Sequence, residues 1–114
     1  MPIDWTVALV YTDGDKDLLA ELAAIFTQDC PRLLLEARES IAQMDHSKLE
    51  RAAHTLKGRL AFFGIHDLRD KALQLEIMGR NRVSGEAVEA LAEIEAEIER
   101  IIPEFNALSR EQGK

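Results

Sequence analysis

Apolar residues recur at alternating steps of four and three along most of this chain, which is the spacing of amphipathic helices. The most regular stripe lies toward the C-terminus and keeps its phase for three heptads. The pattern predicts one short helix over about residues 4–10 and four long helices over about 15–44, 47–63, 67–78 and 85–110. The C-terminal stripe consists of Ala87, Leu91, Ile94, Ile98, Ile101, Phe105 and Leu108.

Residues typical of helix ends support these boundaries. Asp15 fits the N-cap of the first long helix, and Ser47 with Glu50 fits a capping box at the start of the next one. Gly64 supplies the left-handed residue that closes such a helix. The remaining end signals are Asp67, as the N-cap of the fourth helix, and Gly79, at the end of that helix.

Two prolines fall inside expected helices. Proline removes an amide donor and clashes with the preceding turn, so it bends or ends a helix. The apolar face stays in phase past Pro31, and we therefore expect one kinked helix there rather than two helices. At Pro103 we expect a bend or fraying.

Four long amphipathic helices with short connections predict an all-α fold, an antiparallel up-and-down four-helix bundle with a short extra N-terminal helix. With 114 residues, the chain fits a single domain over residues 1–114 that buries one core. A heptad pattern of this length favours packing inside the bundle, although an intermolecular coiled coil stays open. We expect a monomer.

Composition and charge narrow the function. The net charge of −7 argues against nucleic-acid binding, which needs basic side chains against phosphates. No apolar stretch approaches the roughly 20 residues of a membrane span, and the start lacks the basic region of a signal peptide, so we expect a cytoplasmic protein. Residues 48–71 hold six basic and three acidic residues, a local charge of +3. This charge fits an acidic or phosphorylated partner surface and chance clustering of surface residues about equally well.

His54 is the candidate for chemistry, within the run Ala53-His54-Thr55-Leu56-Lys57-Gly58. On a helix it lies roughly 140° from the apolar stripe, and Gly58 about 180°, so both face outward. A glycine in mid-helix costs about 1 kcal/mol relative to alanine and needs a reason. Gly58 gives steric access to the imidazole, and Lys57, one turn from His54, is placed to stabilise a phosphoryl group on the ring.

A neutral imidazole is a nitrogen nucleophile at pH 7, and attack on an acyl phosphate gives a phosphohistidine. The chain offers no obvious carboxylate cluster for a metal. We therefore expect no cofactor or metal of its own, with Mg²⁺ held by the partner. The other histidines, His46 and His66, lack the spacing of a zinc hydrolase and fit helix entrances.

The run AAHTLKGRLAFFGIHDLRDKALQLE resembles the signature of the histidine phosphotransfer (HPt) domain family of two-component phosphorelays. The resemblance extends over nearly the whole chain. It implies that His54 is the phosphoacceptor, that Lys57 stabilises the phosphoryl group, that Gly58 opens the surface and that Gly64 belongs to a tight helix connection. Arg59 departs from the family, in which this position is often small.

The resemblance further implies partners: receiver domains of response regulators or of a hybrid sensor kinase, with a phosphoryl group relayed between their aspartates. Candidate contacts are Arg51, Arg59 and Phe62, although Phe62 fits a core contact better. Leu22, Ile25 and Phe26 either border the site or belong to the core.

Two other functions compete with a phosphoryl carrier. A histidine kinase is disfavoured, because the chain has no glycine-rich nucleotide pocket and no length for an ATP-binding domain. We therefore expect a carrier that is not an enzyme. A helical adaptor that binds receiver or other signalling domains without carrying phosphate is the alternative, against which the intact His54, Lys57 and Gly58 count.

Overall fold

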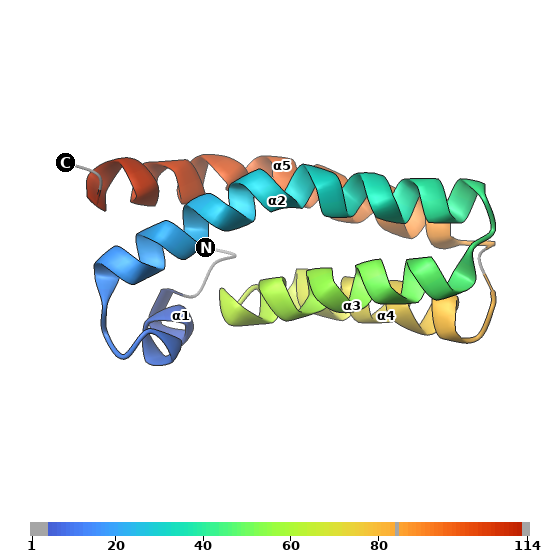
Figure 1. Cartoon of the computed structure of the whole chain (residues 1–114), viewed down its shortest axis with the longest axis horizontal. Helices are drawn as coiled ribbons and strands as arrows, with labels where there is room; N and C mark the ends of the chain where they lie inside the picture. Colours follow the sequence, from blue (N-terminus) through green and yellow to red (C-terminus); the bar gives the residue numbers. More distant parts are fainter. Residues whose placement is uncertain (1–4, 84, 113–114) are drawn as a thin grey trace.

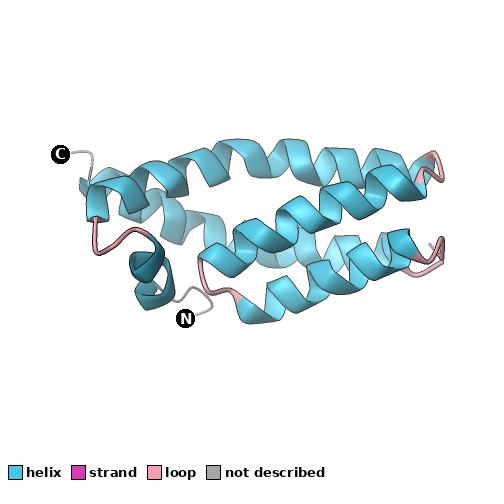
Figure 2. Cartoon of the chain, turned by 60° about the horizontal axis from the view of Figure 1, so that its bottom comes forward, coloured by secondary structure: helices cyan, strands magenta, loops and turns pink. Residues whose placement is uncertain are grey.

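The structure is a computed structural model that describes residues 5–83 and 85–112. Within these residues it contains helices and connecting turns, as Figures 1 and 2 show, and no strand. The helices are α1 (Trp5–Tyr11), α2 (Lys16–Ala42), α3 (His46–Phe62), α4 (His66–Arg80) and α5 (Ala87–Gln112).

The four long helices form an elongated antiparallel bundle of 44 × 21 × 21 Å. In Figure 1, α2 and α5 lie along one side, α3 and α4 lie along the other, and α1 sits at one end. The predicted all-α four-helix bundle with a short N-terminal helix is confirmed. No helix in the described part of the chain combines the length and the hydropathy that crossing a membrane requires.

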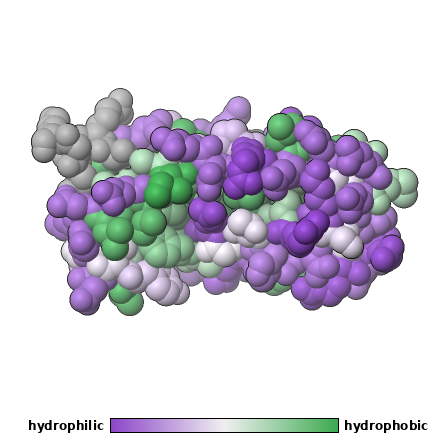
Figure 3. Space-filling model, in the orientation of Figure 1, coloured by the Kyte–Doolittle hydropathy of each residue, from purple (hydrophilic) through white to green (hydrophobic). Residues whose placement is uncertain are grey.

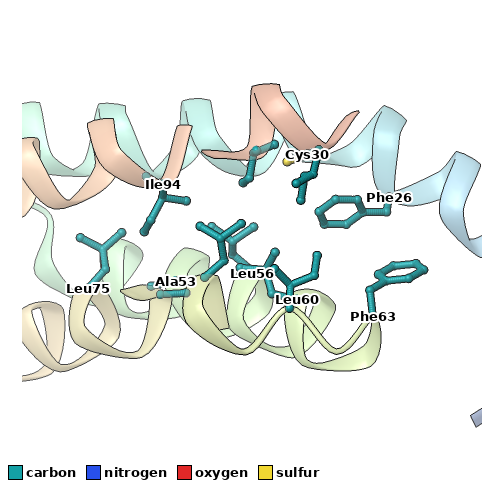
Figure 4. Packing of buried hydrophobic residues seen from close by; sticks show 14 of the residues in the cluster. Phe26, Cys30, Ala53, Leu56, Leu60, Phe63, Leu75 and Ile94 are labelled. Carbon is teal, nitrogen blue, oxygen red and sulfur yellow. The ribbon is translucent and has the colours of Figure 1, made fainter. Parts of the chain in front are cut away.

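The core is made by the stripes that the sequence predicted. Phe26, Phe63 and Phe105 form an aromatic cluster at the end nearest α1, and Trp5 meets the last two edge-on. Aliphatic side chains fill the rest of the bundle, part of which is seen in Figure 4. Cys30 lies in this core, where burial raises the pKa of its thiol to about 12.

α2 ends at Ala42, before the predicted bound of residue 44. Its buried apolar positions run from Leu19 to Ala37, whereas Ile41 is half-buried and Met44 is 68% exposed. Met44 also has a positive φ of 56°, so the helix has already ended at Ala42. The helices are continuous through Pro31 and Pro103.

Two predicted N-caps are wrong. At α3 the cap is Asp45, whose Oδ1 accepts a hydrogen bond from the Lys48 amide at 3.1 Å, so the helix begins ahead of Ser47. At α4 the cap position is Ile65, which makes no side-chain cap hydrogen bond, and Asp67 lies in the first turn. There the acidic group meets the positive end of the helix dipole instead of capping an amide.

The predictions for the three other helix ends have mixed outcomes. Asp15 caps α2 by accepting a hydrogen bond from the Leu18 amide at 3.0 Å, as expected. Gly64 has the expected left-handed conformation, with φ of 68°, directly after the Phe63 cap of α3. Gly79, however, does not end α4, because the helix continues to Arg80.

Gly79 is instead the point of closest approach between α3 and α4. A Cβ at this position would lie 2.7 Å from the Glu50 amide nitrogen and 2.9 Å from the His46 carbonyl oxygen. These are backbone atoms, which cannot turn aside as a side chain would. The absence of a side chain at Gly79 therefore sets how closely the two helices pack.

Candidate functional site

His54 lies in the middle of α3 with its side chain 67% exposed. Its neighbours Ala53 and Leu56 are buried in the core and fix the face that α3 turns inward. The outward direction predicted from the helical spacing is therefore the one that the structure shows.

The ring of His54 is tethered to α4 through Glu76. Nδ1 of His54 lies 2.9 Å from Oε2 of Glu76, whose side chain is only 4% exposed. The other carboxylate oxygen, Oε1, lies 2.7 Å from the Lys57 ammonium. One buried carboxylate thus joins the two side chains that the sequence marked for chemistry.

Arg80 and Glu50 extend this network. The Arg80 Nη2 atom lies 3.1 Å from Glu76 Oε2, the same oxygen that faces His54. Its Nε donates to Glu50 Oε2 at 3.0 Å, which links α4 back to α3. Glu76 therefore faces two permanent cations and one imidazole.

These neighbours keep Glu76 ionised. Burial alone raises the pKa of a carboxyl group, but the adjacent Lys57 ammonium and His54 imidazole outweigh this effect and hold the pKa of Glu76 below its usual value. An ionised carboxylate only accepts hydrogen bonds. The proton on the neutral imidazole must therefore reside on Nδ1, which leaves the lone pair of Nε2 free to react.

The sequence interpretation missed Glu76, Arg80 and Glu50. A signal for Glu76 was present, because it lies four residues after Ala72 and eight after Leu68, on the buried face of α4. A glutamate on an apolar stripe needs a partner for its charge. No comparable pattern marks Arg80 or Glu50, which meet only once the helices are packed.

Gly58 lies one turn after His54 and is exposed. We expected Gly58 to remove a side chain that would crowd the imidazole. A Cβ there would meet nothing within 4 Å outside its own helix backbone, so in this structure the glycine does not relieve such crowding. It instead leaves open surface beside His54, over which another molecule has room to approach.

An apolar groove of about 230 Å³ borders Gly58, between α2 and α3. Phe62 is half-buried in its wall and stacks on Tyr11, with 5.2 Å between the ring centroids. Figure 3 shows apolar surface toward the end of the molecule where α1 and the first part of α2 lie. The groove is lined by Leu22, Ile25, Phe26, Gly58, Arg59, Phe62 and Phe63.

The two candidate arginine contacts lie in different places. Arg59 is at the groove, where its Nη2 atom is 3.3 Å from Asp29 Oδ2 on α2. Arg51 is exposed beside a shallow polar depression that Lys48 and Thr55 also line. The structure brings Arg59 and Phe62 together at the groove and leaves Arg51 outside its lining.

The remaining histidines stand apart from the site. His46 is the first residue of α3 and is half-buried, and His66 is the first residue of α4 and is exposed. Among the described residues, no group of three or more His, Cys, Asp or Glu side chains is placed to hold a metal ion.

A helical bundle that presents one tethered histidine beside a lysine and an exposed glycine has the architecture of a phosphoryl carrier. The family model described as the Hpt domain matches residues 21–103, and the chain belongs to that family. This confirms the predicted family and the predicted phosphotransfer function in a two-component phosphorelay. Proteins of this family carry phosphoryl groups and interact with receiver domains.

The fold is also that of a solved relative. The crystal structure of histidine-containing phosphotransfer protein B (HptB) from Pseudomonas aeruginosa PAO1 matches with a TM-score of 0.87 and 20% sequence identity. The match covers 96% of this chain and 95% of that one. No curated protein sequence matches the chain.

Proposed function

We propose that His54 accepts a phosphoryl group on Nε2 from the aspartate of one receiver domain and passes it to the aspartate of another. The observation that carries this proposal is the contact of 2.9 Å between Nδ1 of His54 and the buried, ionised Glu76. It fixes the tautomer and leaves Nε2 as the exposed nucleophile.

The transfer balances without a proton being moved. The Nε2–P bond forms while the P–O bond to the aspartyl carboxyl breaks, and the aspartate leaves as a carboxylate. Because Nδ1 keeps its hydrogen, the phosphorylated ring is a cation. Glu76 stabilises this cation, and in the reverse step the ring leaves as a neutral imidazole.

Lys57 is proposed to bind the oxygens of the phosphoryl group on His54. It is three residues from His54 on the same helix, and its side chain is 27% exposed. Phosphoryl oxygens on Nε2 attract the Lys57 ammonium away from Oε1 of Glu76. Arg80 stays on Glu76 and keeps that carboxylate compensated after Lys57 has moved.

The groove beside Gly58 is the proposed docking surface for receiver domains, including that of a hybrid sensor kinase. Its apolar lining gives the contact area, and Gly58 lets the partner approach Nε2 closely. Phe62 and Arg59 contribute from the groove and Arg51 from beside it. Mg²⁺ is assigned to the partner's aspartate pocket, and the carrier acts in the cytoplasm as a monomer without kinase activity of its own.

The test is transfer of label from phosphorylated receiver domains to the wild type and to His54→Gln, with circular dichroism to show that both are folded. Acid-labile, base-stable label on the wild type alone is expected, since phosphohistidine has that stability. ATP without a kinase should give no label. Receiver binding without label on either protein would support the helical adaptor instead.

A further inference from the structure

Arg59, which lines the docking groove, forms an ion pair with Asp29. Arg59 comes from α3, next to Gly58, and Asp29 comes from α2. Their closest atoms are 3.3 Å apart, and their side chains are 36% and 32% exposed. The pair is therefore partly open to solvent beside the apolar lining, within reach of a partner that docks in the groove.

Most of the hydrogen-bonding capacity of Arg59 is unused in the free protein. A guanidinium has five N–H donors, and among the described residues Asp29 is the one acidic group within ion-pair distance of Arg59. Asp29 is itself shared, because its Oδ2 lies 3.8 Å from Arg32. Arg32 has a closer partner in Glu36, at 2.8 Å.

An exposed ion pair of this kind adds at most about 1 kcal/mol to the free energy of unfolding, so a stabilising role does not account for the position of Arg59 and Asp29 beside the groove. The pair does restrict Arg59 to a position beside the groove and so lowers the entropy cost of a further contact. The free N–H groups of a planar guanidinium match a carboxylate best, because both of its oxygens are bound at once.

We infer that Arg59, positioned by Asp29, selects among receiver domains by binding a carboxylate that borders the receiver's apolar contact surface. This rests on the proposed function and adds the chemistry of the partner. A receiver with an acidic group at that place pairs with Arg59 as the groove closes. A receiver without one must cover a desolvated, partly unpaired guanidinium and is disfavoured.

The test compares two sources of phosphate. Phosphoramidate, a small phosphodonor, labels His54 without docking, whereas a panel of purified receiver domains, phosphorylated with acetyl phosphate, requires docking. With the receiver that transfers fastest, Arg59→Glu is expected to lower kcat/KM roughly tenfold or more. The phosphoramidate rate should change far less. Arg38→Glu, a reversal of the same charge where Arg38 pairs with Glu95 on the α2–α5 side, is the matched control.

Two further variants separate recognition from structure. The double variant Asp29→Arg/Arg59→Asp restores an ion pair with its charges exchanged and should remain defective with receivers. On the receiver, each acidic residue around the active site is changed in turn to Lys, and one of these changes should recover transfer to Arg59→Glu.

Three results would overturn the inference: unchanged transfer in Arg59→Glu, full rescue by the exchanged pair, or no recovery by any receiver change. Failure of the proposed function looks different. In that case the wild type itself takes no label from phosphoramidate or from any receiver, which overturns both proposals before any Arg59 variant is compared.

Discussion

Glu76 decides the chemical state of the site, although it is not the reacting residue. Its carboxylate is buried, ionised and in contact with His54, Lys57 and Arg80. In the part of the chain that the structure describes, neither cation is hydrogen-bonded to the imidazole, so the carboxylate is what connects them to it. The reactivity of His54 therefore depends on the charge and on the hydrogen-bond acceptor that Glu76 provides.

Replacing Glu76 separates these two contributions. Glu76→Gln keeps an acceptor for the His54 Nδ1 hydrogen but loses the charge. We expect transfer to slow about tenfold, because a hydrogen bond to a charged group contributes about that factor more than a neutral one. Glu76→Ala should slow it further and abolish the tautomer preference, which ¹⁵N NMR of the imidazole reports. A Glu76→Ala protein with wild-type rates and an unchanged tautomer would contradict this role.

The lowered pKa of Glu76 also predicts how stability depends on pH. A carboxyl group whose pKa is lower in the folded state stabilises the fold fully above its unfolded pKa of about 4.3 and loses that contribution as pH falls through the folded value. Urea unfolding should show the wild type losing free energy of unfolding faster than Glu76→Gln below about pH 4.3. Parallel curves for the two proteins throughout the acid range would rule this out.

At the scale of the helices, the sequence predicted the features that depend on the spacing of residues along one helix, such as its buried face. The buried face of α3, from Leu49 to Leu60, follows directly from its apolar period. The predicted start of α3 was wrong, because Asp45 and Ser47 are both residues that cap helices well and lie only two positions apart. The tether to Glu76 could not be read from spacing, because it depends on which side of α4 meets α3.

Two glycines inside helices should respond in opposite ways to the same substitution. The Cβ of Gly58→Ala meets nothing within 4 Å outside its own helix backbone, so better helix propensity should raise the free energy of unfolding by about 1 kcal/mol, while the added methyl slows transfer from receivers. Gly79→Ala places a Cβ 2.7 Å from the Glu50 amide and should destabilise the fold by roughly 1–3 kcal/mol. Thermal and urea unfolding of both variants measure the two changes in stability, and receiver assays measure the rate of transfer to Gly58→Ala.

The opposite ranking would show that the spacing between α3 and α4 is not set at Gly79. Equal losses of stability in both variants would argue that neither glycine is placed for the reason given. Transfer from receivers at the wild-type rate in Gly58→Ala would remove the proposed steric role of Gly58.

For the whole molecule, the apolar heptad residues of α5 pack in the core of the bundle. Its heptad positions from Ala87 to Phe105 are all buried in this one chain, so these residues are not available to a coiled coil with a second copy. We therefore expect a monomer of 12.8 kDa. Sedimentation equilibrium over a range of concentrations measures this, and a concentration-dependent rise toward twice that mass would refute it.

His54 lies in the middle of α3, and within the described residues its exposed side is the face that carries the candidate chemistry. A donor that covers the face blocks an acceptor, so the two partners must take turns and the kinetics should follow a ping-pong scheme. Each partner then has to leave before the next one arrives. Throughput is limited by dissociation, and a very tight complex would stall the relay, so modest affinity is a requirement of this geometry.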